Sequence, residues 1–165
     1  MVPRPKGDCD CIATEAAAIM HPATAAESLQ TLRAFRDKVL ARNERGKQLI
    51  AEYDLFTSRI LLLFILEPSL RRLAAQFVQV IAPTVGTMLP RRANTGDVTK
   101  VTKQTIDIAT RFGDALIAAD RKHKNDCNLA QVVGARMAEI KQQELVGLTG
   151  RELQRVLGLT PNVKT

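Results

Sequence analysis

Two pairs of residues in this sequence have the types and spacing that metal binding needs. Cys9 and Cys11 are two residues apart, and His123 and Cys127 are four residues apart. Residues four apart on a helix share one face, so a helix continuing through 125–126 would let His123 and Cys127 bind one ion. With Cys9 and Cys11 they would complete a tetrahedral Cys3His zinc site. The Asn-Asp pair at 125–126 instead favours a turn, which leaves free thiols and a surface histidine as the alternative.

The same cysteines permit two other kinds of thiol chemistry. A disulfide between Cys127 and either N-terminal cysteine would need an oxidising compartment, and the sequence shows no targeting segment that leads to one. His21 is a candidate imidazole partner for Cys9 or Cys11, because a nearby base promotes the nucleophilic thiolate. However, a histidine before Pro22 is typical of a helix end. The sequence shows no third group that would orient such a thiol–imidazole pair, no suitably spaced pair of carboxylates and no glycine-rich phosphate loop. We therefore expect that the protein is not an enzyme.

Basic residues form a further candidate site. They gather in short clusters, mostly in the second half of the chain, where they can contact phosphates of any sequence. Single-strand binding also uses aromatic side chains, and residues 84–165 contain only Phe112. Nucleic acid is therefore an alternative partner, and solvated helix faces are the simpler interpretation. The candidate interaction residues are Arg91, Arg92, Lys100, Lys103, Arg121, Lys122 and Lys124, and Arg71 and Arg72 form another cluster in the first half.

The composition is that of a small folded protein. Of the 165 residues, 45% are apolar, 25% charged and 4% aromatic, which excludes a disordered chain. The 24 basic and 17 acidic residues give a net charge of +7, which suits an acidic partner or simple solubility. The longest apolar run, residues 60–66, is far short of the ~20 residues of a membrane-spanning helix. With no targeting segment visible, we expect a cytoplasmic protein without a membrane span.

Apolar residues recur at three- and four-residue steps, which predicts an all-α fold: a bundle of six to seven helices with no sheet. Capping boxes that begin at Thr24 and Thr149 mark helix starts, and Pro83 marks a helix end. The expected helices are residues 12–20, 24–46, 47–66, 69–82, 97 or 99–122, 128–146 and 149–157. The helix over 47–66 should be the most buried, because its second half is apolar on nearly every face. The expected core residues are Leu29, Leu32, Phe35, Leu49, Tyr53, Phe56, Ile60 and Phe64.

Residues over about half of the chain follow a pattern that is similar to that of a known protein family. Its parts are residues 11–14 (Cys-Ile-Ala-Thr), 21–22 (His-Pro), 32–40 (Leu-Arg-Ala-Phe-Arg-Asp-Lys-Val-Leu), Gly46, Tyr53 and 67–73 (Glu-Pro-Ser-Leu-Arg-Arg-Leu). Over residues 9–82 it resembles the Cys-Phe-Ile box domain, a helical module usually found at the C-terminus of diverse bacterial proteins. The cysteine motif diverges, because Asp10 takes the place of the family cysteine and Cys11 that of the aromatic residue. The resemblance implies a bacterial source and a helical accessory module, and no reaction.

The chain divides into a flexible arm (1–8), a Cys-Phe-Ile-box-like helical bundle (9–89) and a C-terminal helical portion (97–165) that packs on the bundle or extends it. The seam from Val98 to Ala119 has coiled-coil-like spacing, which is typical of an internal core stripe and also of a partner surface. We expect loop 90–96 and helix 98–119 to form the interacting surface. The expected function is that of a non-catalytic bacterial accessory protein that binds a protein partner or a second copy. A nucleic-acid-binding module and a cysteine- or zinc-dependent protein are the alternatives; apart from that zinc, no cofactor is expected.

Overall fold

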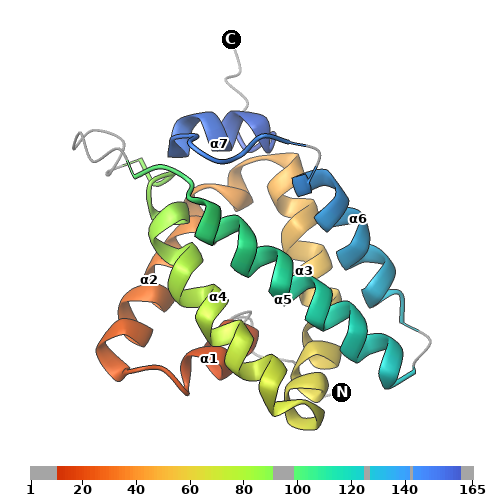
Figure 1. Cartoon of the computed structure of the whole chain (residues 1–165). Coiled ribbons are helices and arrows are strands. Elements are labelled where there is room, and N and C mark those ends of the chain that lie inside the picture. The colour runs from red at the N-terminus through yellow and green to blue at the C-terminus, as the bar shows by residue number, and fades with distance from the viewer. Residues whose placement is uncertain (1–10, 91–98, 125–126, 142, 161–165) are drawn as a thin grey trace, which may run out of the picture.

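The computed structural model describes residues 11–90, 99–124, 127–141 and 143–160. Within them the fold is all-α, as predicted, with seven α-helices, one short 3-10 helix and an isolated antiparallel bridge between Lys100 and Thr149. None of the helices in these ranges is long and apolar enough to cross a membrane. The helices (Figure 1) are α1 (Cys11–Ala17), α2 (Pro22–Lys38), η1 (Leu40–Arg42), α3 (Glu44–Leu66), α4 (Pro68–Gly86), α5 (Lys103–Lys122), α6 (Leu129–Lys141) and α7 (Gly150–Val156).

Helix α4 is the centre of the bundle. Helices α1 and α2 pack against it, and α5 runs alongside it (Figure 1). Its buried alanines, Ala74, Ala75 and Ala82, have small side chains that let neighbouring helices approach closely. The prediction that α3 is the most buried helix is wrong, since Leu55 and Ile65 of α3 are 73% and 76% exposed. The second half of α3 is apolar on nearly every face, but only one face of the helix packs against the bundle.

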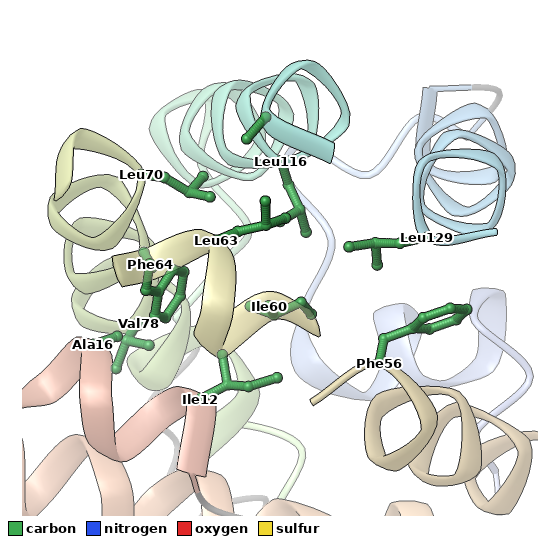
Figure 2. Close-up of a cluster of buried hydrophobic side chains, with 12 residues drawn as sticks. Ile12, Ala16, Phe56, Ile60, Leu63, Phe64, Leu70, Val78, Leu116 and Leu129 are labelled. Carbon is green, nitrogen blue, oxygen red and sulfur yellow. The ribbon is translucent and has the colours of Figure 1, made fainter. Parts of the chain in front are cut away.

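The buried apolar side chains form two core clusters. The main cluster (Figure 2) lies between α1, α3, α4, α5 and α6, so residues from both predicted portions of the chain share one core. The second cluster joins the end of α4 to α7 and its flanking segments. Leu32 of α2 packs against both clusters. Of the predicted core residues, Phe56, Ile60 and Phe64 are buried, and Leu29, Leu32, Phe35, Leu49 and Tyr53 are half-buried.

The break between α2 and α3 depends on one buried asparagine. The prediction of a single helix over residues 24–46 is wrong, because α2 ends and α3 begins inside this range. The Asn43 side chain accepts a hydrogen bond from the Gly46 amide (2.6 Å) and thereby caps α3. It also donates to the backbone carbonyls of Val39 (3.1 Å) and Leu159 (3.2 Å). The bond to Leu159 ties the start of α3 to the segment after α7.

The other helix ends agree with the predicted start and stop signals in some cases and differ from them in others. Helix α2 begins at Pro22, a residue suited to a first helical position, so the predicted capping box at Thr24 lies inside the helix. Pro83 lies inside α4 and does not end it, contrary to the prediction. Pro83 is exposed, which places the backbone bond that it lacks on the solvent side of the helix. The capping box of Thr149 and Glu152 is confirmed at the start of α7.

Gly46 tests how closely α3 packs on η1. A Cβ at this position would lie 2.1 Å from the carbonyl oxygen of Leu40, a backbone atom that cannot rotate away. We therefore expect Gly46→Ala to lower the free energy of unfolding by about 1–3 kcal/mol, as overpacking does. Urea denaturation followed by circular dichroism measures this change.

Gly134→Ala is the matched control. A Cβ there meets only Cδ1 of Ile117, at 3.9 Å, and the position lies within α6. Because alanine is the better helix former, we expect a gain of about 0.5–1 kcal/mol. A Gly46→Ala protein as stable as the wild type would contradict the close contact.

Candidate functional site

The most distinctive surface feature is a largely apolar stripe along α3. Exposed residues recur at alternating steps of three and four between positions 48 and 65, which places them on one helix face. Within it Leu55, Leu62 and Ile65 are 73%, 45% and 76% exposed. Single exposed leucines are ordinary, but a continuous stripe with this spacing is typical of helix–helix interfaces. We call it the outer stripe of α3, and its residues are Gln48, Ala51, Leu55, Ser58, Leu62 and Ile65.

A groove lies between the outer stripe and the start of α6. Leu55 and Leu62 line it from α3, and Cys127 and Val132 line it from the other side. The buried ring of Phe56 also contributes to the lining, so the apolar surface continues from the stripe toward the core. A stripe with an apolar groove beside it is a surface suited to an amphipathic helix.

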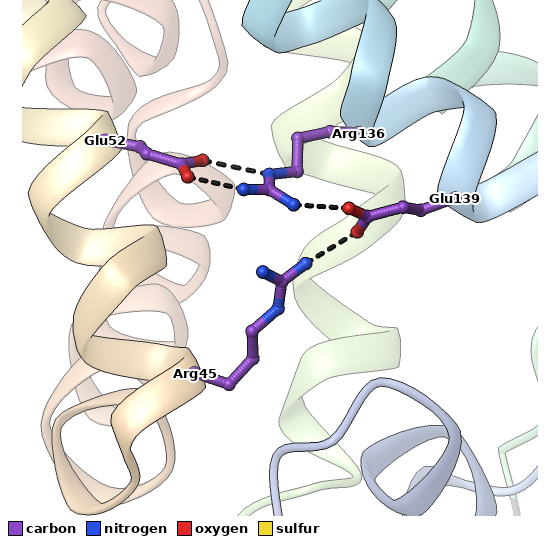
Figure 3. Close-up of polar contacts among 4 residues, drawn as sticks. All are labelled: Arg45, Glu52, Arg136 and Glu139. Atoms are coloured by element: carbon purple, nitrogen blue, oxygen red, sulfur yellow. Dashed lines mark hydrogen bonds and ion pairs between the residues drawn. The ribbon is translucent and has the colours of Figure 1, made fainter.

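Four charged residues join α3 to α6 beside this groove (Figure 3). Arg136 donates from Nε (2.9 Å) and Nη2 (2.5 Å) to the two carboxylate oxygens of Glu52, and from Nη1 (2.5 Å) to Glu139. Arg45 donates to the other oxygen of Glu139 at 2.6 Å. Hydrogen bonding by Arg136 lowers the pKa of Glu52, and the same bond raises the pKa of Arg136. We call these four residues the polar clamp.

A buried ion pair joins α3 to α5. Nε of Arg59 donates to Oδ1 of Asp120 at 2.8 Å, and the two side chains are only 9% and 7% exposed. Nη2 of Arg59 also donates to the backbone carbonyls of Asp120 (3.3 Å) and His123 (2.7 Å). The second carboxylate oxygen of Asp120 accepts from the Ala130 amide in the first turn of α6. Buried charges persist when they are paired and hydrogen-bonded in this way, and this pair fixes α3, α5 and α6 relative to one another.

Of the four predicted zinc ligands, the structure describes the side chains of His123 and Cys127. His123 already has non-helical backbone angles and ends α5, so it does not share a helix with Cys127, and the predicted one-face arrangement is wrong. Nε2 of His123 lies 2.8 Å from Oε1 of Glu67, while Cys127 packs against the main core cluster. Cys9 and the side chain of Cys11 lie outside the described residues. No group of three metal-binding side chains occurs in the described part of the chain.

The predicted basic interaction residues divide between the two ends of α5. Two lie at or just before its start and three at its end. The two groups are about 30 Å apart, because α5 has 20 residues. They therefore do not form one patch. The residues near the start of α5 are Lys100 and Lys103, and those at its end are Arg121, Lys122 and Lys124. Arg91 and Arg92 lie outside the described residues.

The sequence prediction missed a basic groove between α4 and α5, lined by Arg72, Arg111 and Lys122. The spacing of Arg111 and Lys122 could have indicated this groove. They are 11 residues apart, which is about three helical turns, so both lie on one face of α5. Glu67 lines the same groove and accepts from Lys122 at 2.5 Å. The pKa of Glu67 is lowered mainly by this bond and also by the contact with His123.

The helix predicted to bind a partner, α5, faces inward. Ile108 and Ala119 of its seam are buried. Phe112 stacks on Phe77 of α4, with ring centroids 5.1 Å apart. The seam therefore packs within the bundle as an internal core stripe, and an interacting surface on the exposed face of α5 stays a prediction. Apart from its first residue, the predicted loop 90–96 lies outside the described residues.

Comparison of the chain with family models, with curated proteins and with solved structures found no significant match. The resemblance of residues 9–82 to the Cys-Phe-Ile box domain stays a prediction. The function is therefore inferred from the surfaces and cavities of the fold.

The polar clamp predicts how stability depends on pH. Because Arg136 lowers the folded-state pKa of Glu52, the stabilisation is fully present above the unfolded value of about 4.5. It is lost as the pH falls through the lower folded value. We expect the free energy of unfolding in urea to decrease from about pH 6 to about pH 3, and to decrease less in Glu52→Gln.

Glu27→Gln is the control, because Glu27 is an exposed glutamate of α2 outside the clamp. This variant should keep the pH dependence of the wild type. The clamp would be disproved by a Glu52→Gln protein with the same pH dependence as the Glu27→Gln protein.

Proposed function

We propose that this protein works by binding and not by catalysis, and that the outer stripe of α3 binds the same stripe of a second copy. The observation that carries the proposal is the exposure of Leu55, Leu62 and Ile65 on one face of α3, with only the small Ser58 between the two leucines. Burial of such side chains is the main driving force of association between helices. A bacterial source and a cytoplasmic location accompany the proposal as predictions of the sequence.

A second copy is the favoured occupant because the stripe is complementary to itself. In an antiparallel pair centred on Ser58, positions whose numbers sum to about 116 lie opposite one another. Leu55 then meets Leu62, and the small Ala51 meets the large Ile65. The two Ser58 residues lie at the twofold axis. This is the isologous geometry of a symmetric dimer.

Charge also permits two copies to meet at this face. From Ala51 to Ile65 the outer stripe contains no charged residue, although the chain has a net charge of +7. Of the charged residues flanking it, Glu52 is paired with Arg136 and Arg59 with Asp120, whereas Asp54 is exposed beside Leu55. The stripe spans four helical turns, which makes a small interface, so we expect a dissociation constant on the order of micromolar.

A pair of charge substitutions tests this dimer and its direction. We expect the wild type to dimerise with rising concentration in sedimentation velocity. Leu55→Glu and Leu62→Lys should each be monomeric, because a charge would be buried against leucine. Mixed together they should form a heterodimer, because the antiparallel arrangement places the introduced glutamate opposite the introduced lysine.

Val146→Glu serves as the control, since Val146 is 57% exposed and lies outside the outer stripe. It should dimerise like the wild type. All three variants should keep wild-type helicity, because they change exposed residues. A wild type that stays monomeric at every concentration would exclude the second copy as occupant, and variants that fail to pair when mixed would exclude the antiparallel arrangement.

Nucleic acid binding is a second candidate function, favoured by the basic groove of Arg72, Arg111 and Lys122. When the logarithm of the affinity is plotted against the logarithm of the salt concentration, each phosphate that the groove neutralises makes the slope more negative by about 0.9. We expect a mixed-sequence DNA duplex to bind with a slope of about −2 to −3, measured by fluorescence anisotropy. Arg111→Glu should weaken this binding, and Lys47→Glu, an equal charge change on α3, should have less effect. Binding that is indifferent to salt would exclude this candidate.

A further inference from the structure

An apolar cavity, open to solvent on one side, lies between α3 and the rest of the bundle. Its volume is about 390 Å³, and its walls come from α1, α2, η1, α3, α4 and α5. Close packing normally fills the space between helices with side chains. Here three of the wall positions are alanines, whose side chains are too small to fill it: Ala13, Ala16 and Ala74.

Aromatic rings gather at this cavity. The chain has five phenylalanines, one tyrosine and no tryptophan, and four of these six rings line the cavity. All four are half-buried, whereas the other two, Phe56 and Phe64, are buried in the main core cluster. The cavity therefore carries aromatic surface that the side chains around it leave uncovered. The four rings come from four different helices: Phe35 of α2, Tyr53 of α3, Phe77 of α4 and Phe112 of α5.

Two of these rings already stack on one another. The ring centroids of Phe77 and Phe112 are 5.1 Å apart, and their planes differ by 18°. Aromatic rings attract further rings in offset-stacked or edge-to-face contact, at centroid distances of about 4.5–7 Å. Because Phe35 and Tyr53 lie on other helices, a ring inside the cavity can contact aromatic groups from more than one side.

The charges in the lining disfavour an ion as ligand. Among the described lining residues, the charged ones are Arg36 and Asp54, one of each sign. Nε of Arg36 donates to Asp37 at 2.9 Å, and Asp54 is exposed. An anion would be repelled by Asp54 and a cation by Arg36, and either one would lose its hydration in the apolar interior. A neutral molecule avoids all of these costs.

We propose that this cavity binds one neutral aromatic molecule of two or three rings, in contact with the four aromatic side chains of the lining. The size follows from the volume. An apolar cavity of about 150 Å³ holds one benzene molecule of six carbons, so 390 Å³ corresponds to roughly 15 non-hydrogen atoms. An apolar interior lined by aromatic side chains, with few polar groups, is the usual form of a small-molecule site.

The binding can be measured with N-phenyl-1-naphthylamine, a neutral molecule of three rings. Titration of the full chain with this probe should saturate at one molecule per chain. It should also change the emission of Tyr53, because this residue lines the cavity and is the one tyrosine of the chain. 1-Anilinonaphthalene-8-sulfonate is the same molecule with an added sulfonate group. By the change in Tyr53 emission it should bind about tenfold more weakly or worse, because its charge loses hydration in the cavity.

Two pairs of substitutions test the cavity and its rings. Ala13→Leu fills the cavity and should weaken N-phenyl-1-naphthylamine about tenfold, whereas Ala26→Leu adds the same bulk to an exposed position of α2 and should not. Ala13→Met, with a more flexible side chain, is a second filling variant should Ala13→Leu fail to fold. Phe35→Leu removes a ring of the lining and should weaken the probe about 2- to 10-fold. Phe64→Leu removes a ring outside the lining and should leave the affinity unchanged.

Three results would overturn the proposal. The first is the absence of a saturable change in Tyr53 emission with N-phenyl-1-naphthylamine, and the second is wild-type affinity in a folded cavity-filling variant. The third is equal affinity of the Phe35→Leu and Phe64→Leu proteins, which would exclude recognition by the rings. The dimer proposed above is tested separately, because Leu55→Glu changes only the outer face of α3. That variant should bind the probe as the wild type does, and Ala13→Leu should still dimerise.

Discussion

Helix α3 is held to the bundle by the apolar packing of one face and by long polar side chains that pair with α5 and α6. The alanines of α4 let α1, α2 and α5 approach closely, and the large side chains Phe56, Ile60 and Phe64 pack α3 into the main core cluster. Arg59 reaches Asp120 on α5, and Arg136 reaches back from α6 to Glu52. Each arginine therefore pairs with a carboxylate on another helix, which satisfies the charge that it brings.

This arrangement gives α3 two apolar faces with different roles. The inner face lines the cavity of about 390 Å³ and a neighbouring one of about 260 Å³, and both share Tyr53, Ile60 and Phe112 as lining residues. The outer face carries the stripe that solvent reaches. The proposed dimer involves only the outer face, because the inner face is turned toward the bundle.

Local signals predicted some helix starts correctly, although the capping box predicted at Thr24 falls inside α2. The capping box of Thr149 and Glu152 is a correct one, because both hydrogen bonds are made within four residues. Asn43 is the opposite case, since its cap of α3 is reinforced by a bond to Leu159, 116 residues away. The candidate site was predicted poorly for a similar reason. The seam of α5 and the stripe of α3 have the same spacing, and spacing alone does not say which one the bundle covers.

The sequence by itself determined that this chain folds as helices, because three- and four-residue apolar periodicity is a property of each segment alone. It also determined that the second half of the helix over 47–66 would be apolar on nearly every face. Only the tertiary structure decided which of those faces is buried. That choice depends on how closely helices distant in sequence can approach, and thus on the alanines of α4 and on the arginine pairs that hold α3 in place.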